Sequence, residues 1–342
     1  MLKTVHLSRA QKAELSQAMS ADAAFSTGQS AGLSLVSLET AGRGLRSVSE
    51  IGKEIEALSR QTGEIGVLLV KTGKDFLWST PTPSAHSAPE SHKLSPLDAV
   101  RILLQGKGNQ FGFAHKNQAN GNLCDDVMPL LEHHDTVGFS QGRSLGWHTE
   151  DAVFNRPEVD LSPDIISLAF LRAREDDIAS ISMPNVDDLS LASKKALERE
   201  VFVARLSLAH GAGEGRNWPM KSLIYNGSYL RVSFARIEED REIYLSNGTY
   251  GALLELRELL DAYCVDIKIE AGDILFIDNK RVAHCRKPYA SPPRYNGTDR
   301  WQRRLISVHG SRASAVDDCF LDGAKNLPRV IDADKAIAKM ER

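Results

Sequence analysis

The segment Gly146-Trp-His-Thr-Glu-Asp-Ala-Val-Phe154 carries half of the pattern that decides how this chain folds. In an extended strand, residues two apart project from the same face, with their Cα atoms about 7 Å apart. His148 and Glu150 have this spacing, so an imidazole nitrogen and a carboxylate oxygen can reach one metal ion. The spacing alone also fits a histidine at a strand end beside a solvated glutamate. Indeed His133-His134-Asp135 contains a second such pair.

The other half lies far downstream, in Gly272-Asp-Ile-Leu-Phe-Ile-Asp-Asn-Lys-Arg-Val-Ala-His-Cys-Arg286. An apolar strand ends there in a polar turn, and His284 follows that turn. Two histidines and one carboxylate make the facial triad of non-haem iron(II) oxygenases, which leaves coordination positions open for a chelating 2-oxo acid and dioxygen. His148, Glu150 and His284 are therefore the predicted metal ligands.

An arginine-rich segment, Arg294-Tyr-Asn-Gly-Thr-Asp-Arg-Trp-Gln-Arg-Arg304, follows His284, and the turn that contains its glycine leads into a strand with several arginines. The planar guanidinium fork makes two parallel hydrogen bonds to one carboxylate. An arginine on a strand beside the metal histidine is thus suited to the far carboxylate of 2-oxoglutarate. The alternative is a solvated arginine cluster on a strand edge.

The rest of the chain predicts a mainly β core decorated by helices. Short strand-like runs separated by turn residues are typical of a sandwich or barrel. They are Phe111–Phe113, Ile165–Leu171, Ile178–Ser182, Tyr229–Phe234, Asp273–Asp278 and Arg304–Val308. Helical spacing appears in residues 186–202 and 249–263. Residues 1–64 are expected to form a helical N-terminal extension. A buried strand is expected to begin at Ile65. The Pro/Ser-rich segment 79–95 is expected to be a surface loop rather than a domain boundary.

Bulk composition limits the function classes. The 342 residues are 42% hydrophobic and 25% charged, as in an ordinary soluble globular protein. A net charge of -3 argues against a general nucleic-acid binder. No run approaches the roughly 20 apolar residues of a membrane span. The N-terminus has no apolar signal core, and the four cysteines form no C-x-x-C pair, so a reducing, cytoplasmic location is expected.

The order of these motifs resembles the clavaminate synthase-like group of Fe(II)/2-oxoglutarate-dependent oxygenases, which includes asparagine oxygenase and an arginine β-hydroxylase. The motifs are HTEDA, then GDILFIDN, then H-x-R, then RY-x-G-TDRW, and the resemblance covers roughly residues 118–308. It implies a double-stranded β-helix (jelly roll), with residues 1–342 as one oxygenase domain and 110–310 as its core. It also implies Fe(II), 2-oxoglutarate and O2 as the metal and co-substrates.

The same resemblance implies further roles, residue by residue. Arg300, in TDRW, is similar to the arginine that grips the C5 carboxylate of 2-oxoglutarate. Ser180 stands where the group usually has a threonine that helps to bind 2-oxoglutarate. Arg304 resembles the arginine that takes the substrate carboxylate, and Gln118 resembles a position that binds the substrate amino group. Residues 140–144 are expected to contribute to the substrate site as well.

One departure bears on specificity. Members that act on basic or amide side chains often have an aspartate where this chain has Ser233, at the end of Tyr229-Leu-Arg-Val-Ser233. Without that carboxylate, a buried guanidinium or ammonium would lack its counter-charge, which weakens an arginine-hydroxylase assignment. Retention of Glu150 argues against a halogenase of this group.

The expected activity is hydroxylation of an unactivated C–H bond, at Cβ or Cγ, of an L-amino acid or a similar small molecule, in specialised metabolism such as antibiotic biosynthesis. The substrate is either free or tethered to a carrier protein, and no nucleic-acid or membrane partner is expected. Two alternatives stay open. One is desaturation or cyclisation of such a substrate, and the other is a non-catalytic jelly roll that binds a metal.

Overall fold

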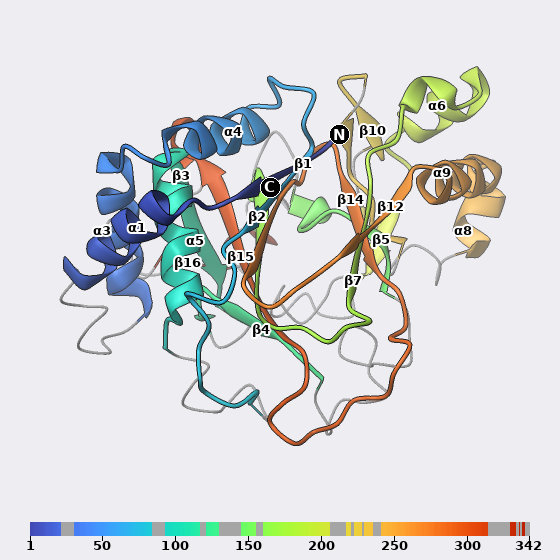
Figure 1. Ribbon diagram of the computed structural model, residues 1–342. Coiled ribbons are helices and arrows are strands. Elements are labelled where there is room, and N and C mark those ends of the chain that lie inside the picture. Colours follow the sequence, from blue (N-terminus) through green and yellow to red (C-terminus); the bar gives the residue numbers. More distant parts are fainter. Residues whose placement is uncertain are drawn as a thin grey trace.

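Two β-sheets face each other at the centre of the protein, and helices lie on both outer sides (Figure 1). The computed structural model describes residues 1–21, 31–83, 93–116, 121–129, 145–154, 160–205, 217–219, 222–227, 229–234, 241–313, 329–332, 335 and 337–338. Gln118 and residues 140–144 lie outside the described residues, so their expected roles stay predictions.

The larger sheet has eight strands in the order β1-β2-β13-β6-β15-β3-β16, with β4 paired to β15. Its pairs are antiparallel except for β1 with β2 and β3 with β16. The strands are β1 (Leu2–His6), β2 (Val67–Lys71), β3 (Gln110–His115), β4 (Asp125–Val127), β6 (Ile165–Arg172), β13 (Asp273–Asp278), β15 (Trp301–His309) and β16 (Val330–Ile331).

The smaller sheet has four strands in the order β12-β7-β14-β5. They are β5 (Leu145–His148), β7 (Ile178–Ser182), β12 (Cys264–Lys268) and β14 (Ala283–Arg286), and all their pairs are antiparallel. Two short hairpins complete the described strands, β8 (Val203–Arg205) with β9 (Asn217–Pro219), and β10 (Ile224–Tyr225) with β11 (Tyr229–Leu230).

Central strands of the larger sheet are covered on both faces, which explains why their sequences are continuous apolar runs rather than alternating ones. In β2, Val67 and Leu69 face the smaller sheet and share a core with Ile181 of β7. Leu68 and Val70 point the other way, into a second core shared with the N-terminal helices. Every residue of β13 is buried.

The helices of the first hundred residues cover the outer face of the larger sheet (Figure 1). They are α1 (Arg9–Ala21), α3 (Ala31–Gly44), α4 (Ser49–Ser59) and α5 (Pro96–Lys107). A capping box between Ser95 and Asp98 starts α5. The buried carboxylate of Asp98 then pairs with Arg101 of the helix and Arg303 of β15, which ties α5 to the sheet.

Helices on the opposite side are α6 (Leu191–Leu197), α8 (Arg241–Ser246) and α9 (Tyr250–Ala262), to the right in Figure 1. Leu256 and Leu260 of α9 pack in one core with Ala283 of β14. Short 3-10 turns occupy Ala152–Phe154, Val186–Asp188 and Gly310–Arg312. No helix of the described ranges is long and apolar enough to span a membrane.

Three expected boundaries need correction. Residues 2–6 form strand β1, so the expected helical extension of residues 1–64 is wrong at its start. These residues are extended because their backbone pairs with the parallel strand β2. Because β1, β2 and β16 belong to the larger sheet, limits of 110–310 for the core are too narrow. The expected helix at residues 186–202 is a 3-10 turn followed by α6 alone.

Candidate active site

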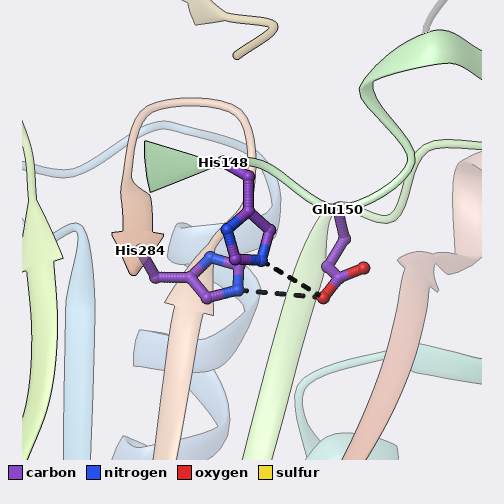
Figure 2. Close-up of side chains that lie close together, drawn as sticks. All are labelled: His148, Glu150 and His284. Carbon is purple, nitrogen blue, oxygen red and sulfur yellow. Dashed lines mark ion pairs between the residues drawn. The ribbon is translucent and has the colours of Figure 1, made fainter. Parts of the chain in front are cut away.

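Three potential metal ligands converge on the inner side of the smaller sheet (Figure 2). His284 on β14 lies directly opposite His148, the last residue of β5, and Glu150 follows in the turn. The Nε2 atoms of His148 and His284 lie 3.9 and 3.7 Å from the same Oε1 of Glu150. One ligand atom from each residue falls within 4.8 Å of the others, which is compact enough for a single ion. Two histidines and one carboxylate suit iron(II).

The protonation state of His148 suits a metal ligand. Its Nδ1–H donates to the carbonyl oxygen of Gly146 at 2.8 Å, so the lone pair is on Nε2, the atom nearest Glu150. Burial, reinforced by the charge of His284, lowers the pKa of His148 to about 3, which keeps the ring neutral. Burial raises the pKa of Glu150, but Arg304 and the histidines outweigh it and hold that pKa well below its usual range.

Asn279 fixes the backbone of the turn that carries Glu150. Its Oδ1 accepts from the Glu150 N–H at 2.7 Å, and its Nδ2 donates to the Glu150 carbonyl at 3.0 Å. The same Nδ2 also donates to the carbonyl of Pro163 at 3.0 Å, and the side chain is buried. The sequence contained a signal for this residue, the Asp-Asn pair that ends the GDILFIDN motif, but its partner lies 129 residues away.

Arg304 reaches the triad from the larger sheet. Its Nη1 lies 2.6 Å from Oε1 of Glu150, and its Nη2 lies 2.7 Å from Oδ2 of Asp125 on β4. Burial lowers the pKa of Arg304, but these two carboxylates raise it above its ordinary value, so the guanidinium stays charged. Arg303, on the opposite face of β15, is fully buried, and the side chain of Arg304 is mostly buried. The alternative of a solvated arginine cluster on a strand edge is therefore excluded.

Ser233 also lies beside the triad, because a single antiparallel bridge places it opposite His148. The neighbouring Thr149 N–H donates to the carbonyl of Val232 at 2.9 Å, which fixes this segment against the metal turn. Ser233 is partly exposed. The position that differs from the group's usual aspartate thus adjoins the expected iron.

Arg300 occupies a separate pocket, which it lines with Phe170, Tyr289 and Gln302 among others. Its Nε donates to Asp177 at 2.5 Å and its Nη2 to Asp176 at 3.3 Å, and the guanidinium lies 3.6 Å from the centre of the Tyr289 ring. Its Nη1 is buried and has no hydrogen-bond partner among the described residues. A buried donor without a partner is costly, so this atom is suited to a ligand oxygen.

Ser180 is not brought together with the triad. It is paired with Cys285 on β14, whereas Ile181 is paired with His284. Because alternate residues of a strand face opposite sides, Ser180 is directed away from the face that carries His284. Its hydroxyl donates to Asp266 of β12 at 2.7 Å. The structure therefore does not support the expected contact between Ser180 and 2-oxoglutarate.

Comparisons with known proteins agree with this arrangement. Residues 226–305, which include His284, Arg300 and Arg304, match the family described as taurine catabolism dioxygenase TauD, TfdA family. An enduracididine beta-hydroxylase from Streptomyces hygroscopicus is 29% identical over 265 residues, which cover 70% of this chain and 74% of the relative. Clavaminate synthase 2 from Streptomyces clavuligerus is 26% identical over 237 residues, which cover 66% of this chain and 68% of the relative.

The fold has counterparts among solved structures. An asparagine oxygenase in complex with Fe(II), 2S,3S-3-hydroxyasparagine and succinate matches with a TM-score of 0.76 at 21% identity, over 96% of this chain and 99% of that chain. This likeness confirms the expected fold, a jelly-roll core with helical additions. Sequence motifs, family match and relatives agree, and the chain is similar to members of the clavaminate synthase-like group of Fe(II)/2-oxoglutarate-dependent oxygenases.

Proposed function

We propose that this protein uses Fe(II), 2-oxoglutarate and O2 to hydroxylate an unactivated C–H bond, at Cβ or Cγ, of an L-amino acid or a similar small molecule. His148, Glu150 and His284 hold the iron. Arg300 binds the C5 carboxylate of 2-oxoglutarate, and Arg304 binds the carboxylate of the substrate. When bound, the iron and its co-substrates supply the oxidation itself, and the protein supplies binding, orientation and exclusion of water.

The observation that carries this proposal is the convergence of the triad with Arg304. The Nε2 atoms of two imidazoles and one guanidinium approach the same oxygen of Glu150 between the two sheets. A cation beside a facial triad is what a carboxylate-bearing substrate needs in order to lie next to the metal. The unpartnered Nη1 of Arg300 supports a second carboxylate site in the same protein.

The substrate class rests on the relatives and on the charges near the metal. The enduracididine beta-hydroxylase and the asparagine oxygenase compared above are named for amino-acid substrates. Ser233 lies beside His148 and supplies no negative charge, so we propose that the side chain of the bound substrate carries no positive charge. Gln118 stays the proposed contact for the substrate amino group.

The test is a panel of L-amino acids incubated with the protein, Fe(II) and 2-oxoglutarate in air. We expect one or a few of them to stimulate succinate formation and to gain one oxygen atom, as seen by mass spectrometry. His284→Ala should abolish this turnover, whereas His6→Ala, which removes an exposed histidine outside the site, should retain it. A panel that stimulates no succinate would contradict the proposal. A product lacking two hydrogens would indicate desaturation or cyclisation.

We also propose that residues 1–342 form one oxygenase domain that acts in the cytoplasm on small molecules, without a nucleic-acid or membrane partner. Support for a single domain comes from the larger sheet, which combines β1 and β2 near the N-terminus with β16 near the C-terminus.

A further inference from the structure

The pocket around Arg300 contains a second arginine, Arg172 of β6, which has no role in the proposed function so far. Both arginines line this pocket, together with Phe170 and Tyr289 among others. Phe170 belongs to the core between the two sheets, and Arg172 is two residues further along the same strand. Because alternate residues of a strand share a face, Arg172 is also directed between the sheets. The wall of the pocket therefore carries two guanidinium groups.

The charge of Arg172 is not balanced by an acidic side chain in the part of the chain that the structure describes. Its Nη2 donates to the backbone carbonyl oxygen of Thr80 at 2.5 Å, which is a neutral acceptor. Arg300, in contrast, forms ion pairs with Asp177 and Asp176. Arg172 is partly buried, and a cation that is removed from water without an opposite charge favours the binding of an anion.

Each of the two arginines also has one buried donor atom without a hydrogen-bond partner among the described residues. These atoms are Nε of Arg172 and Nη1 of Arg300. Arg172 is paired with Trp301, the residue that follows Arg300, so the two side chains start from adjacent positions on neighbouring strands. Buried donors without partners are rare and costly. Two of them in the wall of one pocket suit a ligand with two acceptor oxygens, which a carboxylate provides.

We propose that Arg172 is a second binding residue for the co-substrate, and that the C5 carboxylate of 2-oxoglutarate lies between Nη1 of Arg300 and Nε of Arg172. The inference rests on the proposed function and adds a residue to it. It also has a consequence for the product. Decarboxylation removes C1 and leaves the C5 carboxylate in succinate, so the two arginines hold succinate as well. The pocket thus favours diacids over 2-oxo acids that have no second carboxylate.

The experiment measures binding, so that it does not depend on turnover. The protein is loaded with Zn(II), a redox-inert ion. It is then titrated by calorimetry with 2-oxoglutarate, with succinate and with 2-oxopentanoate, which has a methyl group in place of the C5 carboxylate. The titrations are repeated on Arg172→Gln, Arg172→Lys, Arg300→Gln and the double variant Arg172→Gln/Arg300→Gln. Arg329→Gln is the matched control, because Arg329 also donates to a backbone carbonyl, that of Gly112, but pairs with Glu39 of α3, away from the pocket.

We expect Arg172→Gln to weaken 2-oxoglutarate and succinate by at least about 10-fold and 2-oxopentanoate by less than about threefold, because only the two diacids carry the carboxylate that the pocket holds. Arg172→Lys should keep part of the affinity, since it retains the charge but loses the planar fork. The losses in Arg172→Gln and Arg300→Gln should not add in the double variant, because both groups contact one carboxylate. Arg329→Gln should bind as the native protein does. Unchanged Zn(II) affinity and a cooperative unfolding transition verify that each variant is folded.

Two results would overturn the role of Arg172 even if turnover is found. One is native affinity for 2-oxoglutarate in Arg172→Gln. The other is equal weakening of 2-oxoglutarate and 2-oxopentanoate, which would mean that Arg172 only supports the structure of the pocket. If Arg172→Gln does not fold, the same ratio in Arg172→Lys decides.

The inference and the proposed function can fail separately. If the diacids bind as expected but no amino acid stimulates succinate formation, the proposed function fails and the role of Arg172 stands. If the native protein does not bind 2-oxoglutarate, both fail.

Discussion

Replacing Asn279 with Ala should weaken the metal site without removing a ligand. The buried side chain of Asn279 makes three hydrogen bonds, two to the backbone of Glu150 and one to Pro163. At about 1 kcal/mol each, their loss should cost the metal-free protein about 3 kcal/mol of unfolding free energy. A group that orients a ligand in this way typically contributes a factor of about 10 to 100 in metal affinity, or about 1.4 to 2.8 kcal/mol.

The assay has two readouts. Chemical denaturation in the presence of a chelator gives the stability, and calorimetric titration with Co(II) gives the metal affinity. Gln105→Ala is the matched control, because Gln105 is equally buried and its amide donates to Ser167 and Ser307 on the far face of the larger sheet. It should lose about 2 kcal/mol of stability and keep its Co(II) affinity. If Asn279→Ala loses stability but binds Co(II) as tightly as Gln105→Ala does, Asn279 does not position Glu150.

Other expectations follow from single residues. Arg300→Gln should raise the KM for 2-oxoglutarate by at least about 30-fold, since a buried donor to a carboxylate is lost, and a KM within threefold of the native value would contradict that role. Ser180→Ala should change the same KM by less than about twofold, because its hydroxyl faces Asp266 and the loss of one distant hydrogen bond leaves the pocket intact. Ser233→Asp should raise kcat/KM for a cationic amino acid relative to a neutral one by about tenfold or more, measured in a competition assay, and an unchanged ratio would remove Ser233 from the specificity site. The metal-free protein should lose stability as the pH falls below 6.5, because His148 takes up a proton near pH 6.5 when unfolded but only near pH 3 when folded. Between pH 6.5 and pH 5 the native protein should therefore lose about 2 kcal/mol more unfolding free energy than His148→Asn does, at 1.36 kcal/mol per pH unit. Equal pH dependence of the unfolding free energy in the two proteins would refute this prediction.

The triad was accessible from sequence because its signals are local. His148 and Glu150 are two residues apart, and His284 follows an apolar strand and a polar turn. The period of a strand and the chemistry of the side chains indicate each half, and the order of the surrounding motifs joins the two halves into one site. The same holds for β6 and β13, whose apolar runs predict strands that the structure contains.

What the sequence could not provide depends on partners far along the chain. Strand β1 is stabilised by β2, which lies more than 60 residues later, so the polar N-terminal segment by itself does not predict a strand. Asp125 forms an ion pair with Arg304 because β4 pairs with β15, and these strands are far apart in the sequence. The sequence also does not fix which face of β7 carries Ser180, because a shift of one residue in register reverses the face on which each side chain lies.

The pairing of His148 with His284 gives the iron a mechanical role. The two histidines are cross-strand neighbours, and β5 is the last strand of its sheet, with the bridge between His148 and Ser233 on its other side. An ion bound by both imidazoles clamps β5 and β14 in the one alignment that also presents Glu150. Loss of the ion would therefore weaken the pairing of β5 with β14 at the edge of the smaller sheet, and it would also remove the metal that the reaction needs.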